Sequence, residues 1–304
     1  MSTPTGEQYS LAFEGGSRQS RAIITEVAAG LRALEIDGVA VVETYPETTL
    51  PSYASGIVLV PWPNRVEDGQ WMLDGEEQQL DITEPKKHNA IHGLLRNTAY
   101  RVAERAPSSI TLTATVFPQH GYPFQLSTSV RYELGIDGLT VTHTITNAGV
   151  RSAPVAIGAH PYLRLGDEPM EQLTLTLGAS THIEVDARLN AIGESPVDGT
   201  AYDLRDGVLV NDLELDDGFG GVPAGATHRL THGDGRFVEL WRDDAFSYVQ
   251  VFTNTRYPKG GALGLALAIE PMTAPAGALR SGDGLRWLAM GETMSASWGI
   301  RYSG

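Results

Sequence analysis

The 304-residue chain contains no cysteine. It therefore cannot form a disulfide, a zinc–thiolate site or an iron–sulfur cluster, and it has no thiol nucleophile. Basic side chains are scarce as well: 22 Lys and Arg residues face 37 Asp and Glu residues, for a formal net charge of −15. This acidic balance argues against nucleic acid or an anionic membrane surface as a partner. It also favours a neutral ligand over an anionic one, unless arginines gather locally.

Long hydrophobic runs and targeting signals are missing too. The longest uncharged apolar stretch, residues 260–269, is about half of the ~20 residues that a membrane-spanning helix needs. No basic segment followed by an apolar run opens the chain, so no secretory signal is visible and we expect a cytoplasmic location. With 41% hydrophobic and 19% charged residues, the composition is typical of a globular protein. We expect a monomer or a homodimer.

Helical periodicity is also rare, whereas the alternation of apolar and polar residues that is typical of strands recurs along the chain. In residues 110–116, apolar residues alternate with threonines. Residues 125–146 form two runs of alternating apolar and polar residues around a Gly-Ile-Asp-Gly turn, which predicts a hairpin. Only residues 23–36 contain enough helix formers to suggest a helix, but an internal glycine and a following Asp-Gly turn favour two strands. With no linker visible, the pattern predicts one all-β domain over residues 1–304, a large antiparallel β-sandwich.

Two loop segments hold polar side chains between prolines and glycines. Asn64 and Arg65 form the first pair, and an amide beside a planar guanidinium suits hydroxyl or carboxylate oxygens, although a solvated loop arginine is the commoner case. His88 and His92 lie four residues apart, but the neighbouring proline and glycine disfavour the helix that a metal-binding pair at this spacing needs. His92 is therefore interpreted as a hydrogen-bonding group in a cleft or as a structural histidine.

Two apolar segments each end in a titratable group. His160 follows the apolar residues 156–159, and an imidazole can give or take a proton near neutral pH. Glu270 closes the apolar run 263–269, and Pro271 is expected to end the strand there. A half-buried carboxylate without a cationic partner has a raised pKa, which suits a general base; the alternative is a strand-edge glutamate in a salt bridge.

Other catalytic signatures are absent or weak. The sequence contains no glycine-rich nucleotide-binding motif in a strand-to-helix context and no Gly-x-Ser-x-Gly segment. Asp216, alone, is most simply read as part of an acidic turn. The remaining histidines lie in or beside alternating strands and turns, and we expect them at the surface; they are His120, His143, His182, His228 and His232.

Taken in order, these segments and two others resemble the aldose 1-epimerase (galactose mutarotase) family over nearly the whole chain. No single motif is specific, but the ordered set is. The matching segments are Asn64-Arg65-Val66 with Gly69, Asn89 to Gly93, His160-Pro-Tyr162, Asp216 to Phe219, Gln250-Val-Phe-Thr253 and Glu270-Pro-Met-Thr-Ala-Pro275.

The resemblance implies a β-sandwich with a sugar cleft and with neither a metal nor an organic cofactor. By similarity, Glu270 is the general base at the anomeric hydroxyl, His160 is the general acid at the ring oxygen, and His92 assists near that oxygen. The residues that the resemblance assigns to the sugar hydroxyls are Asn64, Arg65, Tyr162, Asp216 and Gln250. A carboxylate and an imidazole suffice to open and reclose a hemiacetal.

Three alternatives remain at this stage. The first is a mutarotase for hexose 6-phosphates, for which Arg96 and Arg164 are candidate anion-binding residues. Arg164 is notable because this chain reads His160-Pro-Tyr-Leu-Arg164, where family members carry small polar and amide groups. The second is a noncatalytic sugar-binding protein on the same fold. The third, a lyase or hydrolase, needs two cleft carboxylates, for which only Glu270 and Asp216 qualify.

Overall fold

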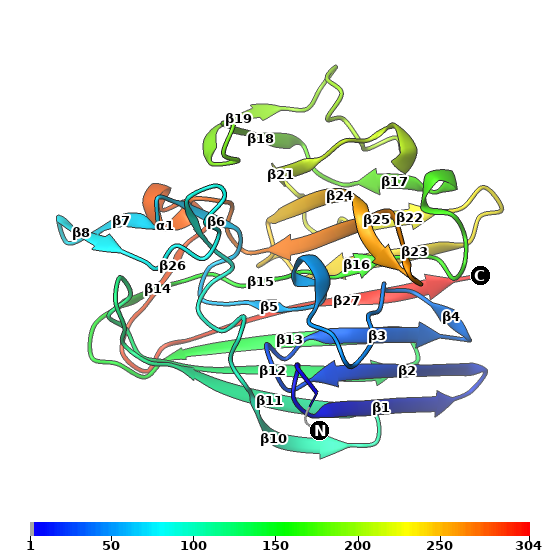
Figure 1. Cartoon of the computed structure of the whole chain (residues 1–304), viewed down its shortest axis with the longest axis horizontal. Coiled ribbons are helices and arrows are strands. Elements are labelled where there is room, and N and C mark those ends of the chain that lie inside the picture. The colour runs from blue at the N-terminus through cyan, green and yellow to red at the C-terminus, as the bar shows by residue number, and fades with distance from the viewer. Residues whose placement is uncertain (1–2) are drawn as a thin grey trace.

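Antiparallel strands make up most of the computed structural model, which describes residues 3–304 (Figure 1). The largest sheet of this range has nine strands. Its nine strands, in spatial order, are β10 (Arg101–Ala106), β11 (Ser109–Val116), β12 (Leu126–Gly135), β13 (Gly138–Asn147), β27 (Thr293–Ser303), β23 (Phe237–Arg242), β22 (His228–Thr231), β17 (Thr174–Leu177) and β20 (Val208–Leu209).

A second large sheet carries the residues of greatest functional interest. In spatial order its strands are β19 (Ala191–Pro196), β18 (Thr181–Val185), β21 (Asp216–Gly220), β24 (Tyr248–Lys259), β25 (Ala262–Met272), β15 (Gly158–Ala159) and β5 (Val58–Leu59), and β16 (Tyr162–Leu163) also pairs with β25. One continuous hydrophobic core contains residues of both large sheets, such as Val141 and Trp298 from one and Val251 and Ile269 from the other. The predicted antiparallel β-sandwich is therefore confirmed.

Smaller sheets and short helical turns complete residues 3–304. A four-stranded sheet packs against β12 and consists of β1 (Gln8–Gly15), β2 (Arg18–Thr25), β3 (Leu31–Ile36) and β4 (Val39–Ala40). The two-stranded pairs are β6 (Arg65–Glu67) with β9 (Asn89–Ile91), β7 (Gln70–Leu73) with β8 (Glu76–Gln79), and β14 (Ala153–Val155) with β26 (Arg286–Leu288). The helical turns are η1 (Ser52–Ala54), η2 (Met170–Gln172), η3 (Val210–Asp212) and α1 (Ala278–Ser281). Within the described range, no helix is long and apolar enough to cross a membrane.

The strand predictions agree with the structure. Residues 23–36 contain the end of β2 and all of β3, not a helix, and residues 126–147 form the β12–β13 hairpin. The expected surface position was wrong for three histidines, because His143, His182 and His228 are at most 6% exposed. In β13, the alternation that leaves the threonines half-exposed puts His143 on the core side.

The end of β25 differs from expectation in an informative way. The strand does not stop at Pro271 but continues to Met272. On the side of β25 away from β24, β16 pairs with β25 as far as Ala268, and β15 pairs with it only at Met272. Pro271 lies between these two contacts, where a missing N–H breaks no ladder. The chain between β15 and β16 is His160–Pro161, so the histidine leaves the sheet beside Glu270.

Candidate active site

A polar pocket lies over the second large sheet, and the strand register explains which side chains reach it. Gln250 of β24 pairs with Glu270 of β25, and Phe252 pairs with Asp216 of β21. Directly paired residues share one face of a sheet, whereas the alternating neighbours Val251 and Ile269 belong to the core. The cavity has a volume of about 330 Å³. Its lining consists of Tyr53, Ala54, Asn64, Arg65, Thr83, Glu84, Lys87, Ile91, His92, Arg96, His160, Asp216, Phe252 and Glu270.

The opposite wall is built from loop residues with unusual backbone angles. Asn64 (φ 52°) and His92 (φ 64°) both adopt the left-handed conformation, and the backbone N–H of His92 donates to the Asn64 carbonyl at 3.0 Å. Gly93 follows with φ 70°, and a Cβ there would lie 2.1 Å from the carbonyl oxygen of Val60. Non-glycine residues in this region cost of order 1–3 kcal/mol and are concentrated at functional sites. The loop thus holds His92 over the pocket at an energetic cost.

His160 and Glu270 form the central contact of the pocket. His160 Nε2 lies 3.3 Å from Glu270 Oε1, and the two side chains are only 6% and 3% exposed. The His160 ring is stacked on Tyr162 with ring centroids 5.3 Å apart, and the His92 ring meets it edge-on, also at 5.3 Å. The sequence therefore brings an imidazole and a carboxylate together from segments 110 residues apart, within reach of a shared proton.

Arg65 anchors a second polar group beside this pair. Its guanidinium donates to both carboxylate oxygens of Glu84, at 2.9 and 3.1 Å, and to Asp216 Oδ2 at 3.3 Å. The Gln250 amide donates to the other oxygen of Asp216 at 2.9 Å. A bidentate arginine and a doubly bonded carboxylate have fixed orientations. The arrangement presents ordered donors and acceptors, which is what recognition of sugar hydroxyls requires.

Burial dominates the electrostatics of the catalytic candidates. It raises the pKa of Glu270 well above its ordinary value, and the negative charge of Asp216 adds to this effect while Arg65 opposes it. Burial lowers the pKa of His160 to about 3 and that of His92 well below its usual range. The His160–Glu270 pair therefore keeps one proton over a wide pH range, and its two arrangements, carboxylic acid with imidazole or carboxylate with imidazolium, have the same net charge.

Three buried polar atoms of this site have no hydrogen-bond partner among the described residues: His92 Nδ1, His160 Nδ1 and Glu270 Oε2. An unpaired buried polar group costs about 1–3 kcal/mol, so such groups are rare in proteins and need an explanation. All three atoms belong to residues of the cavity lining, where a polar ligand would satisfy them. No group of three or more His, Cys, Asp or Glu side chains within residues 3–304 has the arrangement of a metal site.

The structure brings six of the eight predicted site residues to the cavity wall and places two behind it. Tyr162 supports the His160 ring and directs its hydroxyl to the carbonyl of Tyr53 at 3.4 Å. Gln250 contacts Asp216. Direct sugar contacts by Tyr162 and Gln250 stay a prediction. His88 does not join His92, because its side chain is 65% exposed and lies 2.9 Å from Asp68.

Sequence reasoning missed several residues of the lining. Tyr53 comes from η1, while Thr83, Glu84 and Lys87 precede β9 in an irregular loop. Neither segment has a periodic pattern, so nothing in the sequence indicates which of its side chains turn towards the pocket. Glu84 is the most consequential omission, because it holds the Arg65 guanidinium.

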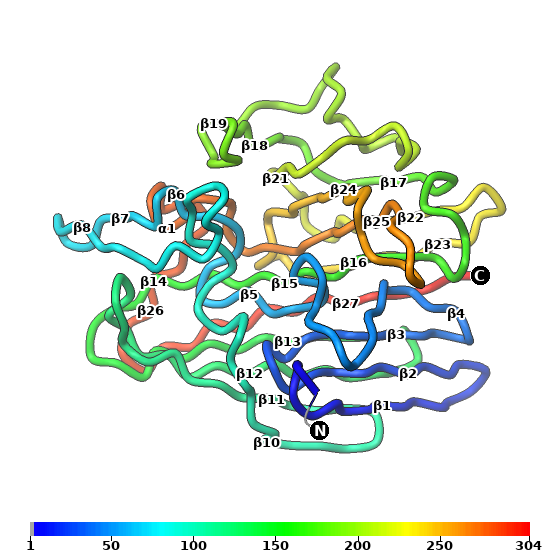
Figure 2. The backbone as a smooth tube through the Cα atoms, viewed as in Figure 1, coloured from blue at the N-terminus to red at the C-terminus, as the bar shows by residue number. Residues whose placement is uncertain are grey.

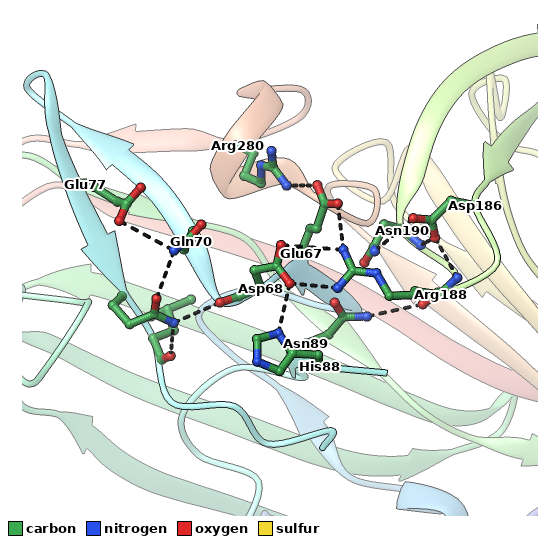
Figure 3. Close-up of polar contacts among 12 residues, drawn as sticks. Glu67, Asp68, Gln70, Glu77, His88, Asn89, Asp186, Arg188, Asn190 and Arg280 are labelled. Atoms are coloured by element: carbon green, nitrogen blue, oxygen red, sulfur yellow. Dashed lines mark hydrogen bonds and ion pairs between the residues drawn. The ribbon is translucent and has the colours of Figure 1, made fainter. Parts of the chain in front are cut away.

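A charged network beside the pocket holds β6 in place (Figure 3). Glu67 lies between Arg188 and Arg280, which come from the β18–β19 connection and from α1, and Asp68 contacts Arg188 at 2.7 Å and His88. Figure 2 shows that α1 and β6 are close in space although they are distant along the chain. A larger cavity of about 480 Å³ next to this network shares Arg65 with the first pocket but is lined by neither His160 nor Glu270. The smaller pocket is therefore the candidate active site.

Known proteins are similar to this chain over nearly its whole length. The family model described as Aldose 1-epimerase matches residues 13–301. The uncharacterized protein YihR of Escherichia coli (strain K12) is 32% identical over 290 residues, which cover 95% of this chain and 91% of that protein. Among solved structures, the GalM/aldose epimerase homologue from C. elegans has a TM-score of 0.82 at 18% identity, covering 98% of this chain and 99% of that one. The galactose 1-epimerase from Lactobacillus acidophilus NCFM has a TM-score of 0.76 at 18% identity, covering 98% of each chain.

Proposed function

Because the chain belongs to the aldose 1-epimerase family, we propose that it interconverts the α and β anomers of a free aldose. The observation that carries the proposal is the buried contact of 3.3 Å between His160 Nε2 and Glu270 Oε1 in a polar pocket. Ring opening needs a base at the anomeric hydroxyl and an acid at the ring oxygen, acting together. This pair provides both groups, together with a proton that it can hold in either position.

The proposed cycle begins once the proton of the pair has moved from Glu270, where burial favours it, to His160, which leaves a carboxylate and an imidazolium. Glu270 accepts the proton of the anomeric hydroxyl, the bond between C1 and the ring oxygen breaks, and His160 donates its proton to that oxygen. The open-chain aldehyde rotates about the C1–C2 bond, and the same transfers in reverse close the ring on its other face. Each half of the cycle exchanges the two arrangements of the pair, so no net proton enters or leaves.

The other site residues orient the sugar in this proposal. Arg65 and Asp216 present a donor and an acceptor that are already fixed by Glu84 and Gln250. Pre-oriented groups reduce the entropy lost on binding. His92 lies edge-on to His160 and, held neutral by burial, can donate or accept one hydrogen bond near the ring oxygen.

Polarimetry on freshly dissolved α-glucose and α-galactose tests the proposal. The wild-type protein should accelerate equilibration above the rate in buffer, and Glu270→Gln should lose at least about 100-fold of that acceleration, because it removes the base. A noncatalytic sugar-binding protein predicts a different result. In that case calorimetry would detect sugar binding while the rate of anomer exchange stayed at the buffer value for a broad panel of aldoses.

A further inference from the structure

The second cavity, of about 480 Å³, adjoins the candidate active site, and the proposed chemistry gives it no role. One part of its lining consists of Ile183 of β18 and residues 190–194, and another comes from the segment 275–283, which includes α1. Neither His160 nor Glu270 lines it. A group bound in this cavity would therefore not be the reacting group itself.

Strand register places both cavities over one face of the second large sheet. Glu194 of β19 pairs with Ile183 of β18, and Ile183 pairs with Gly218 of β21. Gly218 pairs with Gln250, which in turn pairs with Glu270. Directly paired residues share one face of a sheet. Because neighbouring strands lie about 4.8 Å apart, this row of five strands extends over about 19 Å, which is longer than a single pyranose ring.

Arg65 is the residue that the two cavities share. Its guanidinium donates to Glu84 and Asp216, which line the first cavity. Its carbonyl accepts the backbone N–H of Gly277 at 2.7 Å, and Gly277 lines the second cavity. Hydrogen bonds to both linings thus fix Arg65, and a molecule held by Arg65 in the first cavity is adjacent to the second.

The second cavity contains a buried acceptor without a donor. Asn190 lines the cavity and is only 4% exposed. Its Nδ2 donates to Asp186 at 3.3 Å (Figure 3), whereas its Oδ1 has no hydrogen-bond partner among the described residues. Buried polar atoms without a partner are rare in proteins. A ligand hydroxyl in the cavity would donate to this oxygen.

The charges of the lining indicate which ligand fits. Both arginines are already engaged, Arg280 by Glu67 and Arg65 by the carboxylates of the first cavity. Glu194 and Asp283 also line the second cavity, and neither forms an ion pair within residues 3–304. Carboxylates without cationic partners accept hydrogen bonds from hydroxyls and repel anions. The second cavity therefore suits a neutral group that carries several hydroxyls.

The shape of a pyranose connects the two cavities through one hydroxyl. The proposed function, on which this step rests, puts C1 at Glu270 and the other hydroxyls at Arg65 and Asp216. C4 lies opposite C1 across the six-membered ring, so a substituent on the C4 hydroxyl extends away from Glu270, past Arg65. A second sugar that is joined through this hydroxyl leaves C1 free to open.

We propose that the second cavity binds a second sugar unit, and that the preferred substrate is the reducing end of a 1,4-linked oligosaccharide. Asn190 Oδ1 and the carboxylates of Glu194 and Asp283 accept hydrogen bonds from the hydroxyls of that unit. These contacts raise kcat/KM through binding energy that is remote from the reacting bonds. A monosaccharide uses the first cavity alone.

The experiment measures anomer exchange by NMR magnetisation transfer for glucose, maltose, cellobiose and isomaltose, with the uncatalysed rate of each sugar subtracted. All four have the same reducing glucose unit. We expect kcat/KM for maltose or cellobiose, which are 1,4-linked, to exceed that for glucose by about tenfold or more. Isomaltose, whose second unit is attached at C6, should show no such gain. Glucose as the best substrate, or an equal gain with isomaltose, would overturn the inference.

Substitutions in the second cavity test the same preference. Asn190→Ala should lower the ratio of disaccharide to glucose kcat/KM by about tenfold, and Glu194→Ala, at an exposed position, should lower it by a smaller factor. The matched control is Glu184→Ala, because Glu184 is exposed, follows Ile183 in β18 and does not line the cavity. An unchanged ratio in both cavity variants, or an equal fall in the control, would contradict the inference.

If no sugar is accelerated, the proposed function fails, and calorimetry then decides the inference separately. Tighter binding of maltose or cellobiose than of glucose, with the difference lost in Asn190→Ala, supports a second sugar site. Equal or weaker binding of both disaccharides refutes it.

Discussion

Two buried histidines in different parts of the molecule show how the same burial serves different ends. Burial lowers the pKa of both His143 and His160 to about 3. In the core, Trp298 Nε1 donates to His143 Nε2 at 2.9 Å, which fixes the tautomer and satisfies both groups. In the pocket, His160 has an unpaired Nδ1 and contacts an equally buried Glu270. The histidine of the core thus has its partner within the protein, whereas the histidine of the pocket keeps one ring nitrogen available for a ligand.

Exchanging each histidine for glutamine tests this contrast most directly. His160→Gln should lower kcat/KM for the preferred aldose by about 10²–10⁴-fold, the range expected for loss of an acid–base group, with little loss of thermal stability. His143→Gln should lower the melting temperature and retain the kcat of the folded fraction. Steady-state polarimetry and thermal melts on both variants make the comparison, and equal losses of activity in the two would contradict it.

Trp298→Phe should destabilise the core by about 2 kcal/mol, because it leaves His143 Nε2 buried without its donor. Chemical denaturation would give the free energy of unfolding. The control is His143→Leu combined with Trp298→Phe, in which both polar partners are removed together. The double variant should recover part of the loss, and additive losses would show that the hydrogen bond contributes little.

Gln250→Ala should raise KM for the aldose by roughly tenfold with a smaller change in kcat, since the amide orients Asp216 and donates no hydrogen bond to either titrating group of the pair. Rates over a range of sugar concentrations separate the two parameters. A fall in kcat at constant KM would instead place Gln250 in the proton-transfer step.

Glu270→Gln should stabilise the protein at high pH. The pKa of Glu270 is raised in the folded state, so the folded protein binds more protons than the unfolded chain above the ordinary pKa of a glutamate. The Glu270 contribution to the stability of the wild type therefore falls as pH rises from about 5 towards 8, whereas the variant has no such contribution. The difference in melting temperature should grow by at least about 2 °C over this interval. A constant difference would show that Glu270 is ionised equally in both states.

The strands could be predicted from the sequence wherever apolar and polar residues alternate regularly. The threonines of β13 mark one face of the strand, and strand parity then puts His143 on the other face with Val141 and Ile145, although we expect a histidine at the surface. Its residue type alone favours the surface, and its position in the strand decides otherwise. Register decides burial in a sheet, so strand parity is the better guide for a polar residue within a regular strand.

Only part of the candidate site could be predicted from the sequence. Glu270 and His160 were found because each interrupts an apolar segment, and Asp216 and Gln250 only through their ordered motifs. Glu84, Lys87 and Tyr53 come from irregular loops, where the path of the backbone and not a period determines which side chain faces inwards.

The bulge in the β24–β25 hairpin has a consequence for how this protein can evolve. The pairing shifts between Asn254 and Tyr257, and beyond that point the hairpin runs out to an exposed turn at Lys259–Ala262. Insertions at this turn change only the hairpin tip. A one-residue deletion between Ala266 and Glu270 would exchange the two faces and direct the carboxylate into the hydrophobic core. In related sequences, insertions and deletions should therefore occur at the turn of the β24–β25 hairpin, whereas the segment that ends in Glu270 should differ by substitutions alone.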